Sequence, residues 1–224
     1  MFGASLVVAV WERVEIQLVA NQSPIVVTTV ACVRLAIIGL IVCWGFSRVK
    51  ATFPFQITPI SFAIGFLGAA IWILLCRLNL ESQIMSFLGL SPELLGERSA
   101  INPWELYPSD SSRYLFLTIR FTLLILAVPI AEELFLRGFL IRYLASPDWS
   151  ELTIDRIGKS AIAVTAAYGI LTHPSEWIAA GIWFALITLL MLRTKRFWDC
   201  VIAHGITNGI LGIYIIWFQD WRLW

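Results

Sequence analysis

The feature that most constrains this chain is a series of apolar runs, each near 20 residues, separated by charged connections. A helix of about 20 apolar residues spans the hydrocarbon core of a bilayer, where only helices and closed barrels satisfy their backbone groups. The chain is 59% hydrophobic and 14% charged, whereas soluble domains are about 25% charged. We therefore predict an all-α, polytopic integral membrane bundle with five to six or more transmembrane helices.

We treat residues 1–224 as a single membrane-embedded domain. The third apolar run is long for one span, so we expect Pro129 to kink or break it, because proline lacks the N–H that a helix interior needs. The segment Met1–Val10 is apolar but too short to span, and it has no features of a signal peptide. The expected spans are about Pro24–Phe46, Ile57–Leu78, Arg113–Ala145, Ser160–Thr172, Trp177–Leu192 and Phe197–Phe218.

Basic residues indicate how the spans are oriented. Arg48 and Lys50 follow the first span, and a basic cluster at 193–196 precedes the last, so both fall on the same side of the membrane. The positive-inside rule makes that side cytoplasmic. We expect the acidic connection 79–112 and the C-terminus to lie on the opposite side.

Charge and cysteine usage exclude other classes. The net charge is +1, which gives no support for nucleic-acid binding. The cysteines lie in apolar runs without CxxC spacing, so we expect reduced packing residues rather than disulfides or a metal cluster. They are Cys32, Cys43, Cys76 and Cys200.

Three charges interrupt the third apolar run within six residues: Glu132, Glu133 and Arg137. A charged side chain at the centre of a bilayer costs at least about 2.5–3.5 kcal/mol, so such residues are usually paired or functional. Glu133 and Arg137 are four residues apart on one helix face and can form an ion pair. That pair would be purely structural on its simplest interpretation, but it leaves Glu132 unexplained.

The only two histidines of the chain also lie in membrane-embedded sequence. His173 ends one apolar segment at a His-Pro-Ser-Glu corner, and His204 shares a helix face with Asn208 four residues later. With a rise of about 1.5 Å per residue, Glu132, His173 and the His204–Asn208 pair all reach depths of roughly 10–20 Å. Taken singly, each could be a buried polar residue satisfied by a neighbouring helix. Their coincidence favours a site.

This set of residues resembles the CPBP family of intramembrane proteases, which includes the CAAX prenyl endopeptidases and bacteriocin-related immunity proteins. The resemblance covers about residues 113–224. It rests on three motifs in order: Glu132-Glu133-x-x-x-Arg137, His173, and His204-x-x-x-Asn208. Closer similarities link the chain to a bacterial subgroup found beside exosortase (PEP-CTERM) sorting systems. These are the segments His173–Trp177, Ala203–Asn208 and Trp221–Trp224.

The resemblance implies an intramembrane endopeptidase that uses water rather than a serine or cysteine nucleophile. Glu132 would be the general base, and His173 would hold or help activate the water. His204 and Asn208 would donate to the carbonyl oxygen as negative charge develops on it. Glu133 and Arg137 would support the site as an ion pair.

One position departs from the family pattern. Four residues before His173 the family usually has phenylalanine, where this chain has Gly169. We expect the neighbouring Tyr168 to fill the vacated space.

Three alternatives stay open. Two histidines and two glutamates could bind zinc, although the HExxH motif is absent and Arg137 opposes a cation. We therefore expect no cofactor, with zinc as the alternative that a chelator would reveal. A non-catalytic membrane adaptor or immunity-type protein, or a small transporter, could carry the same polar residues.

The sequence does not name the substrate. We expect a membrane protein or lipidated peptide, membrane lipids around the chain, and exosortase-system proteins as possible partners. The expected location is a bacterial inner (plasma) membrane.

Overall fold

The computed structural model describes residues 23–95 and 101–223, and this part of the chain contains helices and no strand. A shorter apolar helix, Ser160–Thr172, accompanies five described helices that are long and apolar enough to cross a membrane. The five are Pro24–Thr52, Pro59–Phe87, Asp110–Ala145, Pro174–Thr194 and Phe197–Phe218. The all-α membrane fold is therefore confirmed. The expectation for Met1–Val10 lies outside the described residues, and the predicted orientation stays a prediction.

The chain forms two compact units that are interleaved in sequence. Unit 1 comprises the described parts of residues 1–54, 98–132 and 208–224, and unit 2 those of 55–97 and 133–207. The divisions fall between Glu132 and Glu133 and between Thr207 and Asn208, inside two continuous helices. Because each unit is assembled from separate stretches, neither corresponds to a detachable segment. The prediction of one domain over 1–224 stays a prediction.

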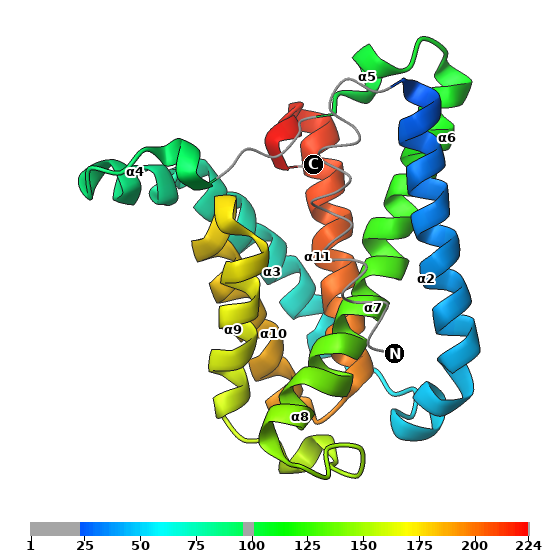
Figure 1. Ribbon diagram of the computed structural model, residues 1–224, viewed down its shortest axis with the longest axis vertical. Coiled ribbons are helices and arrows are strands. Elements are labelled where there is room, and N and C mark those ends of the chain that lie inside the picture. Colours follow the sequence, from blue (N-terminus) through cyan, green and yellow to red (C-terminus); the bar gives the residue numbers. More distant parts are fainter. Residues whose placement is uncertain (1–22, 96–100, 224) are drawn as a thin grey trace. The chain divides into compact units, whose positions relative to one another are not determined.

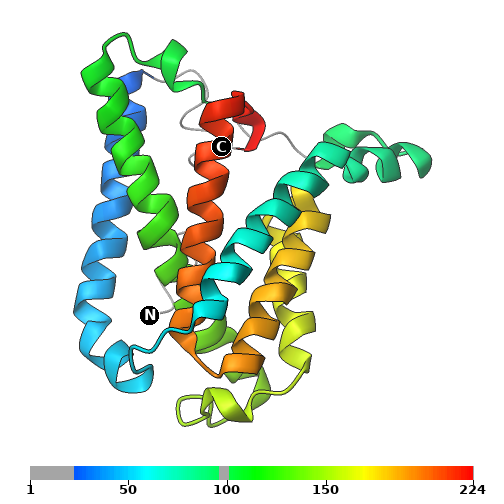
Figure 2. The same ribbon diagram turned by 180° about the vertical axis from the view of Figure 1, so that it is seen from behind.

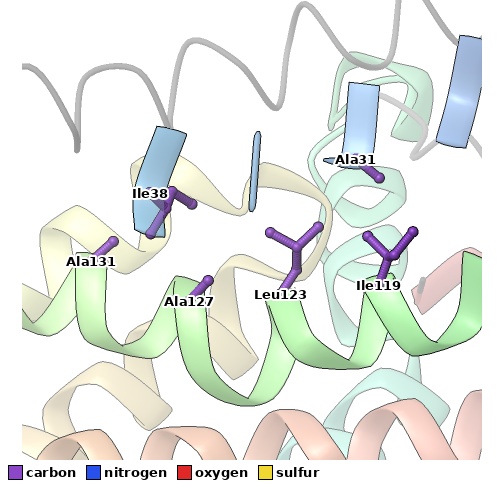
Figure 3. Close-up of a cluster of buried hydrophobic side chains, with 6 residues drawn as sticks. All are labelled: Ala31, Ile38, Ile119, Leu123, Ala127 and Ala131. Atoms are coloured by element: carbon purple, nitrogen blue, oxygen red, sulfur yellow. The ribbon is translucent and has the colours of Figure 1, made fainter. Parts of the chain in front are cut away.

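Unit 1 packs two long helical segments side by side (Figure 1). Its elements are α2 (Pro24–Thr52), α5 (Pro103–Leu106), α6 (Asp110–Thr122), the π-helical turn η2 (Leu123–Ala127), the start of α7 (Val128–Phe135), the second part of α11 (Phe197–Phe218) and η6 (Trp221–Leu223). Side chains four residues apart lie on one helix face and point toward Ala31 and Ile38 of α2 (Figure 3). They are Ile119, Leu123, Ala127 and Ala131.

A second cluster in unit 1 surrounds Tyr107, which follows α5. Its ring stacks on Phe116 at 5.0 Å, and its hydroxyl lies 2.9 Å from that of Thr28. Burial raises the pKa of the Tyr107 hydroxyl, while the hydrogen bond with Thr28 acts in the opposite direction. This contact ties the connection before α6 to the first turns of α2.

The third span is not broken at Pro129, because the helix continues from Asp110 to Ala145; the expected kink there stays a prediction. The helix continues through η2, in which the Val128 N–H donates to Leu123 O, five residues back. In that wider register Leu124 O would need an N–H from residue 129, which proline lacks. The Nδ2 of Asn208 donates to Leu124 O at 3.0 Å and replaces the missing donor. The carbonyl that Pro129 leaves without a backbone donor is therefore satisfied by a side chain.

Unit 2 is built around α10, which runs alongside α9 and α3 (Figures 1 and 2). Its elements are α3 (Pro59–Leu78), α4 (Leu80–Phe87), η1 (Pro92–Leu95), the end of α7, the π-helical turn η3 (Leu136–Leu140), α8 (Ile141–Ala145), η4 (Ile154–Arg156), α9 (Ser160–Thr172), η5 (Pro174–Glu176), α10 (Trp177–Thr194) and the first part of α11. The short turn η5 forms the corner expected at His-Pro-Ser-Glu, because proline disfavours a helical residue before it.

Buried polar residues close the helix ends of unit 2. Asp199 accepts from both the backbone N–H and the hydroxyl of Thr58, at 2.7 Å each, where α3 begins. Glu81 accepts from the Ile178 N–H in the first turn of α10. Arg142 donates to Leu152 O and Ser150 O, which holds the connection after α8. These contacts fix the helix ends of unit 2, which also contains the buried polar cluster described next.

Candidate active site

Glu133, Arg137 and His204 form one buried cluster inside unit 2. Glu133 Oε2 lies 3.0 Å from Arg137 Nη1, and Glu133 Oε1 lies 2.9 Å from His204 Nδ1. The Arg137 contact is an ion pair without good hydrogen-bond alignment. Glu133 and Arg137 are 0% exposed and His204 is 3% exposed. The ion pair predicted from the four-residue spacing is present, and its carboxylate also holds a histidine 71 residues away.

The cluster determines how the His204 ring is protonated at Nδ1. A carboxylate that faces a guanidinium presents oxygen atoms that accept hydrogen bonds. Nδ1 of His204 must therefore carry a hydrogen and donate it to Glu133. In the neutral imidazole Nε2 then bears the lone pair, whereas in the imidazolium Nε2 also donates. The protonation state of His204 thus decides whether Nε2 accepts or donates.

Arg137 is held by more than Glu133. Its Nη2 donates to the Thr188 hydroxyl at 3.2 Å, and the Thr165 hydroxyl lies 2.6 Å from that of Thr188. Both threonines are 0% exposed. The polar chain therefore runs from α9 through α10 and η3 to α7 and α11, all within unit 2.

His173 lies at the corner between α9 and η5. Its Nδ1 is 2.9 Å from the Thr172 hydroxyl and 3.3 Å from Gly169 O. The Thr172 hydroxyl donates to Tyr168 O and Gly169 O is only an acceptor, so the contacts favour an Nδ1–H on His173 as well. Each histidine thus has its Nδ1 held by the protein, a common way of selecting the tautomer.

Aromatic rings surround both histidines in unit 2. The Trp183 ring meets His204 edge-on with centroids 4.5 Å apart, and Trp72 and Phe184 approach His173 at 5.6 and 5.9 Å. Trp183 also contacts Trp72 and Phe184, so the two imidazoles share one aromatic wall. An apolar wall of this kind limits access of water and strengthens nearby hydrogen bonds.

Trp183 is itself fixed by hydrogen bonding and close packing. Its Nε1 donates to Thr207 at 3.2 Å, and the Thr207 hydroxyl lies 2.9 Å from Gly65 O. A Cβ at Gly68 would stand 2.9 Å from Trp183 Nε1, so a larger residue there would displace the indole. The glycine allows α3 to approach α10 closely enough to support the ring.

The space beside Gly169 is filled by Phe184 of α10, which corrects the expectation that Tyr168 would fill it. A Cβ at Gly169 would lie 2.4 Å from Phe184 Cδ2 and 3.0 Å from Ala180 O. Tyr168 instead packs against Phe135 and the edge of Phe184. The aromatic ring that the family pattern places at 169 is therefore supplied from the facing helix.

Glu132 and Asn208 belong to unit 1. Glu132 is 8% exposed and directly precedes Glu133 in α7. Asn208 follows His204 by one turn of α11 and uses one amide N–H to bond Leu124 O. That contact commits one of its two N–H groups to the backbone and leaves the role predicted for the other as a prediction.

Zinc bound by the histidines and glutamates is the alternative that the sequence leaves open. Across residues 23–95 and 101–223, no group of three His, Cys, Asp or Glu side chains is placed to hold an ion. Glu133, the acidic partner of His204, also lies against the Arg137 cation. A conventional zinc site needs at least three protein ligands, and the expectation of no cofactor, with zinc as its alternative, stays a prediction.

The supporting residues were missed from the sequence. Thr165 and Thr188 were hydroxyls within apolar spans, which is a weak signal because threonine readily bonds to its own helix. Trp72, Trp183 and Phe184 were indistinguishable from other aromatic residues of the spans. Only their placement around the histidines distinguishes them.

Comparison with known proteins found one family match. Residues 114–210, a little under half of the chain, match the family described as type II CAAX prenyl endopeptidase Rce1-like. No curated protein and no solved structure matches the chain significantly. The matched segment contains the Glu132-Glu133-Arg137, His173 and His204-Asn208 motifs. The match supports a CAAX-type intramembrane protease of the CPBP family over these residues.

Proposed function

We propose that this protein is a glutamate-dependent intramembrane endopeptidase in which Glu132 activates a water molecule. The observation that carries the proposal is the commitment of Glu133 to Arg137 and His204, at 3.0 and 2.9 Å. Glu133 orients the His204 ring and neutralises the Arg137 cation. We therefore assign proton transfer to the adjacent carboxylate, Glu132. Two carboxylates with separate surroundings commonly divide chemistry in this way.

In the proposed reaction, Glu132 accepts a proton from water while the water oxygen attacks the carbonyl carbon of the scissile peptide bond. The carbonyl oxygen becomes an oxyanion, to which His204 Nε2 and the remaining Asn208 N–H donate. Glu132 then returns the proton to the leaving nitrogen as the C–N bond breaks, which yields a carboxylic acid and an amine. His173 holds the attacking water.

The contact with Glu133 adds a condition to the role of His204. Because Nδ1 donates to the Glu133 carboxylate, Nε2 donates only in the imidazolium form. Glu133 orients the His204 ring through Nδ1, much as a carboxylate orients the imidazole of other hydrolases. A donor to the oxyanion contributes about 2.7–4 kcal/mol where this has been measured.

The proposed substrate is a membrane protein or lipidated peptide at the membrane, and the proposed location is a bacterial inner membrane. Maturation of proteins handled by an exosortase system is the specific setting suggested by the closing sequence motifs. Deleting the gene should then change the mass of sorted surface proteins. Unchanged masses would exclude a role in exosortase-dependent maturation, but they would not contradict the proposed catalytic mechanism.

The catalytic proposal is tested with purified, detergent-solubilised protein and a quenched fluorescent peptide ending in a prenylated CAAX sequence. Glu132→Gln should abolish cleavage, whereas Glu151→Gln, at an exposed glutamate in the connection after α8, should leave the rate unchanged. Cleavage that survives a chelator supports glutamate chemistry. Cleavage that a chelator abolishes and zinc restores would overturn it in favour of a metal.

A further inference from the structure

Two buried threonine hydroxyls connect the active-site cluster to α9 and α10. Thr165 and Thr188 are both 0% exposed and lie in helices that are largely apolar. A buried hydroxyl without a partner is unfavourable, so its bonds identify what it does. The bonds of Thr188 lead to Arg137, and this inference therefore rests on the proposed function of the cluster.

The hydrogen bonds of Thr188 can be assigned from its inventory of one hydrogen and two lone pairs. Its hydroxyl donates to Phe184 O at 2.8 Å, one turn back in α10. Its oxygen accepts from Arg137 Nη2 at 3.2 Å and lies 2.6 Å from the Thr165 hydroxyl, whose own hydrogen also has Ala161 O within 2.9 Å. Two of these three contacts of Thr188 leave its own helix.

This pattern distinguishes Thr188 from other threonines in the spans. The Thr122 hydroxyl donates to Thr118 O at 2.7 Å within its own helix, which is the usual arrangement for a helical threonine. Thr188 differs from it by its lateral contacts with Arg137 and Thr165 and by its full burial. Thr122 is a control for removing a hydroxyl that bonds only within its own helix.

The contact with Thr188 limits the orientation of the Arg137 side chain. A guanidinium is planar and its donors are in fixed positions, so holding Nη2 at one point limits where Nη1 can be. Nη1 is the atom that faces Glu133, and Glu133 in turn holds His204 Nδ1. A rotation of the guanidinium would move the carboxylate and with it the imidazole.

We propose that Thr188, backed by Thr165, is a positioning residue that orients Arg137 and thereby keeps Glu133 on His204. The hydroxyl makes no contact with substrate in this account. Its effect is on the geometry of the oxyanion donor, so it acts on the transition state more than on substrate binding.

Thr188→Val removes the hydroxyl at nearly constant volume, and Thr188→Ser keeps it. With the prenylated peptide as probe, Thr188→Val should lower kcat by about tenfold or more and leave KM within about twofold. Thr188→Ser should stay within about threefold of the wild type, and Thr122→Val should be unchanged. Loss of kcat in both Thr188 variants alike would overturn the role of the hydroxyl.

A second readout does not depend on cleavage. The chain has two histidines, so labelling histidine with ¹⁵N gives two pairs of ring-nitrogen signals, Nδ1 and Nε2 of each imidazole, and His173→Gln assigns them. Thr188→Val should shift the Nδ1–H signal of His204 and leave that of His173 in place, and Thr188→Ser should restore it. An unchanged His204 signal in Thr188→Val would overturn the proposal.

The two readouts separate the possible failures. If the wild type cleaves no probe, the proposed function fails while the His204 signal still decides whether Thr188 positions the cluster. If Thr188→Val does not fold, Thr165→Val takes its place, with a smaller shift of the same signal expected. A His204 signal unchanged in Thr165→Val would then count against the network.

Discussion

Unit 1 packs aliphatic side chains such as Ile38, Leu123 and Ala127 into a buried cluster, whereas unit 2 buries a glutamate in contact with both an arginine and a histidine. The polar contacts of unit 1 include Asn208 with Leu124 O and Tyr107 with Thr28. Unit 2 adds a cluster in which ionisable side chains from two helices meet. Burying charged side chains costs desolvation free energy, and a packing role alone does not require it. The cluster in unit 2 therefore indicates a role beyond packing.

The largest effect is expected in unit 2. Arg137→Met leaves Glu133 buried without its counter-charge, which costs about 3–5 kcal/mol for a buried pair. We expect a large fall in thermal stability in detergent and complete loss of cleavage. The double variant Glu133→Gln with Arg137→Met should regain at least half of the lost stability and none of the activity. Equal stability of the single and double variants would contradict the pairing.

A purely apolar change in unit 1 should separate stability from activity. Leu123→Ala deletes a side chain that is 2% exposed, and large-to-small core changes cost about 2–5 kcal/mol. We expect lower thermal stability with kcat within about twofold of the wild type at a permissive temperature. Leu126→Ala, at a side chain that is 56% exposed, is the control and should change neither.

The smallest effect on stability is expected at Asn208. Asn208→Ala leaves Leu124 O without its donor and should cost about 1–3 kcal/mol. Adding Pro129→Ala supplies a backbone N–H to the same turn and should recover most of that stability. Cleavage should stay low in both, because the oxyanion donor is still missing. Full activity in the double variant would reduce Asn208 to a purely structural role.

The fold and one pair of the cluster were predictable because they depend on local spacing. Runs of about 20 apolar residues indicate spans wherever they occur. Glu133 and Arg137 had to lie on one helix face, and the proline after His173 had to end α9. Each of these follows from a few consecutive residues.

The rest depends on packing between helices. The bond from Glu133 to His204 joins residues 71 apart, and no local pattern specifies it. The π-helical turn before Pro129 leaves Leu124 O without a backbone donor, and the donor that replaces it comes from Asn208 on another helix. Phe184 fills the space beside Gly169 only because α10 lies against α9.

The central claim is that the two adjacent glutamates divide the work, and one comparison tests it most directly. Glu132→Gln and Glu133→Gln are measured side by side for cleavage, thermal stability and the His204 Nδ1–H signal. The account predicts that Glu132→Gln loses cleavage with stability and signal intact, whereas Glu133→Gln loses stability and shifts the signal. Substantial cleavage by Glu132→Gln, or a His204 signal unaffected by Glu133→Gln, would contradict it.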